Sequence, residues 1–244
     1  MLFFHKAKYT IRDIGLKSDI HCHIVPGVDD GARTPEDHSK MLEAMHNAGI
    51  ERMVATPHVC KSLYPNYAAD LRAGYNDTLL AAEYMVDDDF QEMSADPLLY
   101  PDRKHILIEM SYFERSSNIL DQIFRLREMG LEPILAHPER YRFYQESPTG
   151  MAELEKIVDM GCQLQLNVMS LTGVYGPGSK TIIRNLLTHG MYSYIGTDLH
   201  SAHQLEVMNG FYVRESWLDL LQSLCLSNER LFDDLSSSEP YPAP

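Results

Sequence analysis

Residues 18–32 read SDIHCHIVPGVDDGA, and this stretch decides how the rest of the chain is interpreted. It begins like a strand, in which His21 and His23 project to one face and Cys22 projects to the other. A Pro-Gly turn follows, and the carboxylate of Asp30 comes soon after it. Two neighbouring imidazoles and a carboxylate suit a divalent cation, although two histidines of a packed core are the simpler alternative. We expect Cys22 to pack against the core rather than to react.

The same local order recurs along the chain: a buried strand, a polar residue at its carboxyl end, a helix, and a glycine before the next strand. The expected strands are 18–24, 52–56, 79–84, 105–110, 133–136, 163–168 and 192–197, and the expected longer helices are 34–48, 118–129, 148–160, 179–189 and 214–225. Strands that alternate with helices are parallel. Polar residues at the carboxyl ends of strands are typical of the active site of a (β/α) barrel.

An open, doubly wound sheet has the same local order of strands and helices. Such a sheet concentrates its site at one switch point and does not easily bring five strand ends together. Ligand-type side chains follow at least five of the expected strands. We therefore expect an α/β fold in the form of a seven-stranded barrel, with the active site at the C-terminal strand ends.

Composition limits the classes of function. The 244 residues carry a formal net charge of −14 and contain no run of Lys or Arg, which disfavours nucleic acid and anionic membranes as partners. The chain shows no signal-peptide core and no apolar run of membrane-spanning length. Its four cysteines are widely spaced and include no CxxC pair, so we expect a reducing, cytoplasmic location.

The candidate ligands share two properties: each is a histidine or a carboxylate, and each lies at or near the end of an expected strand. They are His21, His23, Asp30, His58, Glu83, Glu109, His137, Asp198 and His200. Any one of these histidines alone is as easily a core or surface residue. Together they suit Mn, Fe or Zn in an open catalytic site, and their number implies two or three ions. Asp29 is expected to hold the turn beside Asp30 rather than to bind metal.

Arg140 is a candidate phosphate clamp, because a planar guanidinium matches two phosphate oxygens. A surface salt bridge with Glu139 or Glu132 is the alternative. Aromatic residues near two ligand-bearing strands are candidates either for a substrate pocket or for core packing: Tyr112, Phe113, Tyr141, Phe143 and Tyr144. The segment GVYGPGSKT at 173–181 looks like a phosphate loop but lacks the GK[ST] that such loops carry.

Six motifs carry a family resemblance: DIHCHIVPGVDDGA, ATPH, AAEY, LIEMSY, LAHPERY and IGTDLH, in that order. They resemble the PHP (polymerase and histidinol phosphatase) superfamily, and within it the metal-dependent protein-tyrosine phosphatases of bacterial capsule and exopolysaccharide clusters. The resemblance covers about residues 18–204 and implies a distorted (β/α)7 barrel, which we expect to extend over residues 18–232. From their own composition, we expect residues 1–17 to be a loosely attached lead-in and residues 233–244 to be a disordered tail. The resemblance also implies a three-metal, usually manganese-preferring site that hydrolyses phosphotyrosine on a tyrosine kinase of polysaccharide export.

The resemblance implies one ligand set for each ion. The first ion would take His21, His23, Glu83 and Asp198; the second Glu83, Glu109 and His137; the third Asp30, His58 and His200. Arg140 corresponds to the family's substrate-binding arginine. Two departures stand out: the segment 60–78 is shorter than expected, which leaves Glu83 the least securely placed ligand, and no second arginine follows IGTDLH before Arg214. His203 is a candidate local substitute for that arginine.

The predicted mechanism is in-line attack on phosphorus by a metal-activated hydroxide, with Arg140 stabilising the developing charge. Two alternatives remain. One is a phosphoesterase for small molecules, such as a histidinol phosphatase. The other is a weakly catalytic regulatory subunit that binds the kinase, with its site altered by the shortened segment.

Overall fold

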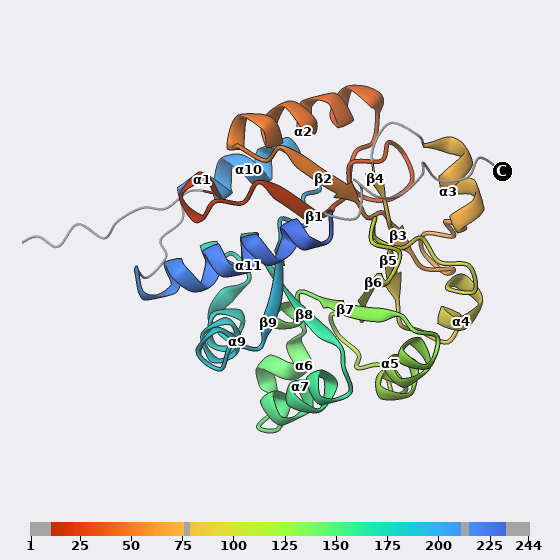
Figure 1. The fold of residues 1–244 in the computed structure, drawn as a ribbon, viewed down its shortest axis with the longest axis vertical. Coiled ribbons are helices and arrows are strands. Elements are labelled where there is room, and N and C mark those ends of the chain that lie inside the picture. Colours follow the sequence, from red (N-terminus) through yellow and green to blue (C-terminus); the bar gives the residue numbers. More distant parts are fainter. Residues whose placement is uncertain (1–10, 76–78, 211–214, 233–244) are drawn as a thin grey trace, which may run out of the picture.

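Parallel strands form the centre of the molecule. The computed structural model describes residues 11–75, 79–210 and 215–232. One sheet has the order β1-β2-β4 and the other has the order β3-β5-β6-β7-β8-β9, and every pairing in both sheets is parallel. The strands are β1 (Ser18–Cys22), β2 (Arg52–Ala55), β3 (His58–Val59), β4 (Leu79–Leu80), β5 (Glu83–Met85), β6 (His105–Glu109), β7 (Glu132–Ala136), β8 (Gln163–Asn167) and β9 (Tyr192–Gly196). Figure 1 shows the strands in the middle of the molecule and the helices around them.

All of the expected strands are present, and the one expected at 79–84 is divided into β4 and β5. After a short break, β2 continues into β3 and β4 continues into β5. Each of these two segments therefore begins in the first sheet and ends in the second. The two sheets also meet where β1 lies beside β9. There the His23 N–H donates to the Leu199 carbonyl at 2.8 Å, and the Asp198 N–H donates to the His21 carbonyl at 2.8 Å. The sheets of the described residues are open in their hydrogen bonding, and the fold is a mixed α/β fold with parallel sheets.

A side chain from the last helix fills the seam between β1 and β9. Helix α11 (Leu218–Arg230) packs on both strands, and its Asn228 is fully buried. The Asn228 side-chain amide donates to the carbonyls of Ser18 (2.8 Å) and Ile195 (2.6 Å), and its carbonyl accepts from the Ile195 N–H at 3.2 Å. Asn228 therefore satisfies buried backbone groups that a continuous ladder would otherwise pair.

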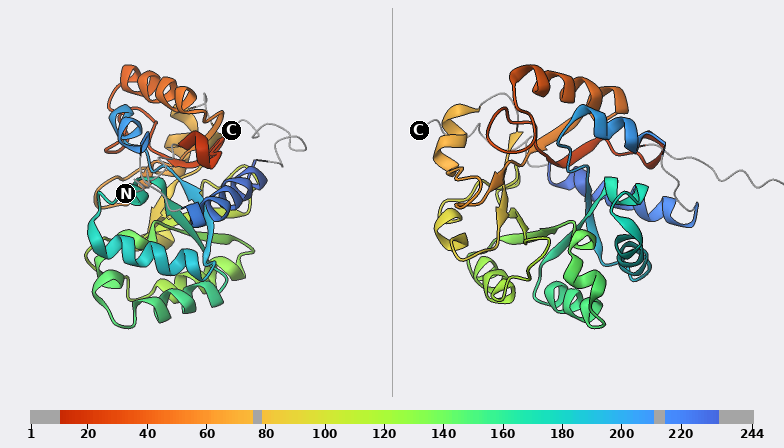
Figure 2. Two further views of the ribbon diagram at one scale, coloured as in Figure 1. Left: turned by 90° about the vertical axis from the view of Figure 1, so that its left-hand side faces the viewer. Right: turned by 180° about the vertical axis from the view of Figure 1, so that it is seen from behind.

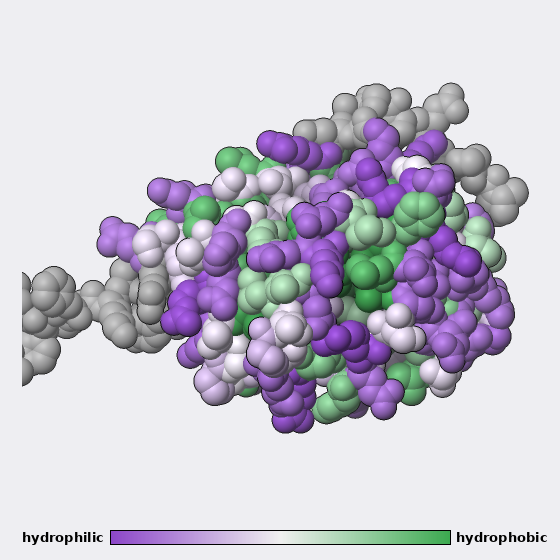
Figure 3. All heavy atoms as spheres, turned by 90° about the horizontal axis from the view of Figure 1, so that it is seen from below, coloured by the Kyte–Doolittle hydropathy of each residue, from purple (hydrophilic) through white to green (hydrophobic). Residues whose placement is uncertain are grey.

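The helices surround the strands. They are α1 (Ile11–Ile14), α2 (Pro35–Ala48), α3 (Ala68–Gly74), α4 (Phe90–Met93), α5 (Ile119–Glu128), α6 (Arg142–Glu146), α7 (Gly150–Asp159), α8 (Val168–Thr172), α9 (Gly176–Thr188) and α10 (Ala202–Met208), with 3-10 turns at Pro138–Arg140 and Glu215–Trp217. α10 packs beside α2 (Figure 2). None of the described helices is long and apolar enough to cross a membrane. Hydrophilic residues cover most of the face in Figure 3, with hydrophobic patches between them.

Helix α2 begins and ends where its sequence dictates. The Thr34 hydroxyl accepts from the Asp37 N–H at 3.2 Å, which caps the first turn, and Pro35 occupies the first helical position. The helix ends at Gly49, which has a φ of 93°, a left-handed conformation that suits glycine. The predicted boundaries of this helix are therefore confirmed.

Other predicted boundaries differ from the structure. Helix α9 begins at Gly176 rather than at 179, and the expected helix 214–225 is α11, shifted toward the C-terminus. Ile14 and Leu16 are buried in the core, so residues 11–17 are not the loosely attached lead-in that we expected. Residues 1–10, Arg214 and the predicted tail at 233–244 lie outside the described residues.

An apolar layer lies among the strands beneath the polar strand ends. Five strands contribute buried residues to it, which are Ile20, Val54, Leu107, Ile134 with Ala136, and Tyr194. Side chains two positions apart on a strand share a face. On β6 the next residue on the same face after Leu107 is Glu109, so this strand carries an apolar side chain below a ligand-type side chain.

Candidate metal centre

The first candidate group contains the two histidines of the opening motif. His21 and His23 are buried, and their Nε2 atoms lie 3.2 Å apart, which confirms that they project to one side of the chain. Glu83 Oε2 lies 3.2 Å from His21 Nε2 and 3.4 Å from His23 Nε2. Asp198 Oδ1 lies 3.3 Å from each of the same two nitrogens. These four residues are the set that the family resemblance implies for one ion, and their donor atoms all lie within 4.8 Å of one another.

A second group faces the solvent side of the first. It contains Asp30, His58 and His200, as the resemblance implies, and adds His23. Asp30 Oδ1 lies 3.5 Å from His58 Nε2 and 3.4 Å from His200 Nε2. The Asp30 side chain is 57 % exposed, yet its carboxylate points to the cluster, as the three-metal interpretation requires.

The third group differs from the expected set. It contains Glu83, Glu109 and His58, because His58 Nδ1 lies 3.0 Å from Glu83 Oε2 and 2.8 Å from Glu109 Oε1. His137 was expected in this place. Its Nε2 lies 3.0 Å from Glu83 Oε1, on the other side of the carboxylate, and it is not a member of the group. His58 thus contacts two groups through its two nitrogens.

The donor set fits a divalent cation. Glu83 Oε2 is buried without a hydrogen-bond partner, although imidazole nitrogens surround it. Burial alone would lower the pKa of His23, but hydrogen bonds to carboxylates, Asp198 foremost, raise this pKa well above its usual value. Burial alone would raise the pKa of Glu83, but neighbouring imidazoles, His21 foremost, lower it well below its usual value. Oxygen and nitrogen donors that converge on an unsatisfied carboxylate oxygen are what a catalytic metal site provides.

Two of the candidate ligands have unusual backbone conformations. His137 has a φ of 34° and directly follows β7, and Asp198 has a φ of 53° and lies two residues beyond the end of β9. Residues other than glycine rarely adopt positive φ, and such strain is concentrated at functional sites. The sequence carried no signal for this feature.

Residues that bind no candidate ion hold the ligands in place. Asp29 Oδ2 accepts from His23 Nδ1 at 2.8 Å, and its Oδ1 accepts from the Gly31 N–H at 3.0 Å, so the predicted turn-holding role is confirmed. A Cβ on Gly31 would collide with the backbone of His23, so the close approach of this turn requires glycine. Cys22 is buried on the core side, as expected.

Strand β8 adds two further supports that the sequence analysis missed. Gln165 Oε1 lies 3.0 Å from His21 Nδ1, and the Asn167 side-chain amide donates to Asp198 Oδ2 at 2.9 Å. Both residues are fully buried. The signal was present, because polar residues at alternate positions of a buried strand, QLQLN, need buried partners.

Arg140 joins the cluster rather than the surface. Its guanidinium forms an ion pair with Asp198. The alternative partners are engaged elsewhere: Glu139 is buried and accepts from the Tyr192 hydroxyl at 2.9 Å, and Glu132 lies 3.2 Å from His105 Nε2. The surface salt bridge considered for Arg140 is therefore wrong.

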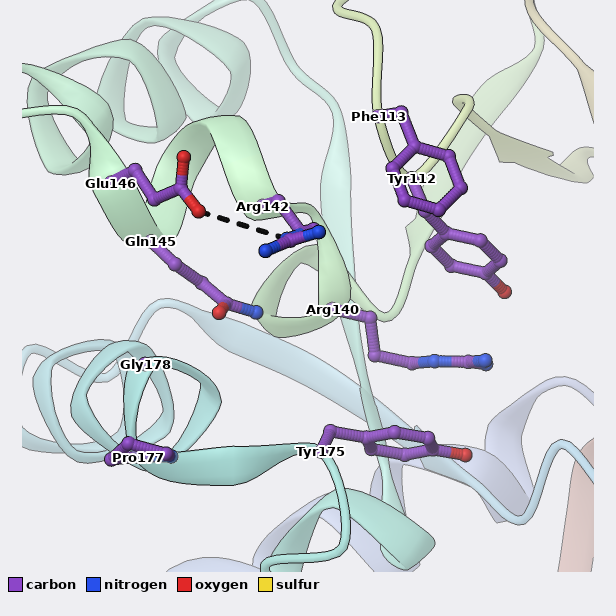
Figure 4. Close-up of a pocket in the computed structure, with 9 residues that line it drawn as sticks. All are labelled: Tyr112, Phe113, Arg140, Arg142, Gln145, Glu146, Tyr175, Pro177 and Gly178. Atoms are coloured by element: carbon purple, nitrogen blue, oxygen red, sulfur yellow. Dashed lines mark ion pairs between the residues drawn. The ribbon is translucent and has the colours of Figure 1, made fainter.

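A pocket of about 580 Å³ opens beside Arg140 (Figure 4). Its lining residues are Tyr112, Phe113, Arg140, Arg142, Gln145, Glu146, Tyr175, Pro177 and Gly178. Of the five aromatic candidates, Tyr112 and Phe113 line the pocket, whereas Tyr141 and Tyr144 are buried in the core and Phe143 packs against it. Tyr175 was missed, because nothing in a glycine-rich loop marks its one aromatic residue as part of a site.

Tyr64 packs against the cluster, whereas His203 lies on the surface. The ring of Tyr64 stacks on His58, with centroids 5.3 Å apart and planes 12° from parallel. His203 is exposed on α10 and pairs with Glu206 at 2.9 Å, so it does not replace an arginine at the site.

Comparison with known proteins identifies the family. A family model described as capsular polysaccharide synthesis, CpsB/CapC, matches residues 17–94 and 82–206, which include all nine candidate ligands and Arg140. The chain belongs to the CpsB/CapC family. The predicted resemblance to the metal-dependent tyrosine phosphatases of bacterial capsule clusters is therefore confirmed.

Individual relatives agree with this assignment. The chain is 30 % identical over 215 residues to the tyrosine-protein phosphatase YwqE of Bacillus subtilis (strain 168), covering 81 % of this chain and 83 % of that protein. It is 25 % identical over 204 residues to the tyrosine-protein phosphatase CpsB of Streptococcus pneumoniae, covering 75 % and 82 %. A structure from work on YwqE and CpsB, described as unique metal-dependent tyrosine phosphatases, matches with a TM-score of 0.68 and 26 % identity, covering 90 % of this chain and 92 % of that one.

Proposed function

We propose that this protein is a metal-dependent protein-tyrosine phosphatase that hydrolyses phosphotyrosine on another protein. The observation that carries the proposal is the buried carboxylate of Glu83, around which candidate ligands from several strands converge. Arg140 lies at the edge of this cluster, with an open pocket beside it. Relatives named as tyrosine phosphatases support the reaction class.

The nine candidate ligands predicted from the sequence are proposed to hold two or three divalent ions. Mn²⁺ is expected, and Fe or Zn are the alternatives. Three overlapping groups of donors support this number, since His23, His58 and Glu83 each belong to two groups. Bound there, the ions would neutralise charge on the phosphoryl group and lower the pKa of a water molecule toward ~7. His137 contacts Glu83 from the other side, and its place in a ligand set remains part of the proposal.

The chain's own residues account for binding of the substrate. The fork of Arg140 is suited to two phosphoryl oxygens, and the ion pair with Asp198 turns the guanidinium toward the cluster. Tyr112 and Phe113 provide aromatic walls beside it for the ring of phosphotyrosine. Phenolate is a good leaving group, so the reaction needs little help from a protein acid.

The setting of this activity is also proposed. The two sheets and the seam between β1 and β9 support a distorted (β/α)7 barrel over residues 18–232. We propose a bacterial tyrosine kinase of polysaccharide export as the substrate, in agreement with the family description, capsular polysaccharide synthesis. We also propose a cytoplasmic location, because the four cysteines are widely spaced and include no CxxC pair. The net charge of −14 supports neither nucleic acid nor direct membrane insertion as a mode of action.

The test combines chelation, mutation and a panel of substrates. Dialysis against a chelator should abolish hydrolysis of a phosphotyrosine peptide, and Mn²⁺ should restore it. Arg140→Ala should lower kcat/KM about 10²- to 10³-fold, as expected for loss of a group that stabilises charge in the transition state. Arg125→Ala, an exposed arginine on α5, should leave kcat/KM unchanged.

Other outcomes would identify the alternatives. Preference for histidinol phosphate over the peptide would indicate a phosphoesterase for small molecules. Fewer than about two ions per chain in a fully loaded sample would favour a regulatory subunit. Full activity after chelation would refute the metal-dependent mechanism.

A further inference from the structure

The glycine-rich segment 173–181 has a different use from the phosphate loop that it resembles. Residues 173–175 connect α8 to α9, and the two glycines on either side of Val174 and Tyr175 have left-handed backbones: Gly173 with a φ of 85° and Gly176 with a φ of 87°. This reversal places Tyr175 at the start of α9 and on the wall of the pocket. The segment therefore brings an aromatic ring, rather than backbone N–H groups, to the site.

The ring of Tyr175 forms one layer of a three-layer stack. The centre of the Arg140 guanidinium lies 4.5 Å from the ring centroid of Tyr112 and 4.5 Å from that of Tyr175. Figure 4 shows the two rings on opposite faces of the guanidinium. Tyr112, Arg140 and Tyr175 follow β6, β7 and β8, which are neighbours in the sheet, so the order of the strands sets the order of the stack.

The stack restricts the directions from which Arg140 can bind a ligand. A guanidinium donates hydrogen bonds in its own plane, and a ring over each face fixes the orientation of that plane. Within the described residues its one hydrogen-bond partner is Asp198, whereas a guanidinium has five N–H donors. The remaining in-plane donors are held beside the cluster and the pocket.

We propose that Tyr175 is a positioning residue, which fixes the plane of the Arg140 guanidinium so that its edge meets the phosphoryl group. This inference rests on the proposed phosphatase activity, and it adds a role for a residue outside the three candidate donor groups. It makes Arg140 a rigid donor from the start, so that binding substrate costs little ordering of the side chain.

A double-mutant cycle tests the inference. The variants are Tyr175→Leu, Arg140→Lys and the two combined, with Tyr175→Phe as the conservative variant and Val174→Ala as an exposed neighbour. The measurements are kcat and KM for para-nitrophenyl phosphate and the inhibition constant of inorganic phosphate. We expect Tyr175→Leu to lower kcat/KM about tenfold and to weaken phosphate inhibition similarly, and Tyr175→Phe and Val174→Ala to stay near the wild type.

The cycle separates this role from a merely structural one. In the Arg140→Lys background, Tyr175→Leu should change kcat/KM by less than about twofold, because an ammonium group has no plane to fix. An equal loss in both backgrounds would overturn the inference. If Tyr175→Leu does not fold with its full complement of ions, Tyr112→Leu gives the same comparison from the opposite face. Wild-type activity of Arg140→Lys would instead contradict the clamp role in the proposed function.

Discussion

Glu83 shows how a residue can be held firmly although the segment before it departs from the family pattern. It contacts four imidazoles, through Oε2 on one side and Oε1 on the other. Its position comes from the sheet rather than from the preceding loop, since Glu83 pairs with His58 between β3 and β5, and its N–H donates to the Pro57 carbonyl at 3.0 Å. The shortened segment 60–78 therefore leaves this ligand in place.

At the same scale, Asp30 tests the number of ions. Asp30→Asn should lower the metal content of the loaded protein by about one ion per chain, because the four-residue group around His21 does not include Asp30. Metal content measured by mass spectrometry after gel filtration checks this. Asp219→Asn, an exposed carboxylate on α11, should retain the full content. An unchanged content in Asp30→Asn would indicate that the site works with two ions.

At the scale of the element, β8 has a role distinct from that of the ligand-bearing strands. Gln165→Leu removes the acceptor that orients the His21 imidazole and should weaken binding of Mn²⁺ about 10- to 100-fold. Titration calorimetry on the metal-free protein measures this affinity. Gln163→Leu is the matched control on the same strand, where the amide contacts His105 and Glu132. Equal affinities for the two variants would contradict the positioning role of Gln165.

The elements differ in how far the sequence predicted them. Strands such as β6 and β7 were predicted because a buried parallel strand is a short apolar run between a glycine-ended helix and a polar strand end. α2 was predicted from its cap, its proline and its terminal glycine. The short helices α8 and α10 were missed, since one or two turns show no periodicity and are stabilised by tertiary packing.

The candidate site was predicted unevenly for a related reason. A residue type at a strand end indicates that a side chain reaches the centre, so every member of the three donor groups was among the predicted candidates. The partner of each side chain depends on angles that strand order does not supply. The family resemblance, and not strand order, assigned His58 to one group and His137 to the set of Glu83 and Glu109. In the structure His58 contacts two groups, and His137 contacts Glu83 of that pair.

At the scale of the whole molecule, Asn228 joins β1 of one sheet to β9 of the other. Asn228→Ala should lower the free energy of unfolding by about 2–4 kcal/mol, because it leaves buried backbone groups of Ser18 and Ile195 without partners. Urea denaturation followed by circular dichroism measures the change. Ser223→Ala, on an exposed position of the same helix, should stay within about 0.5 kcal/mol of the wild type. A similarly small effect of Asn228→Ala would show that the helix, and not this side chain, secures the seam.

The seam also determines when the metal centre can form during synthesis. His21 and His23 emerge from the ribosome early, Asp198 much later, and Asn228 later still. At about 5–20 residues per second, the nascent chain holds its first histidines for roughly ten seconds or more before their partners exist. During that interval those histidines can take up any available cation only loosely. The selection of the correct ions therefore comes after the segment that carries Asp198 and Asn228 has been made.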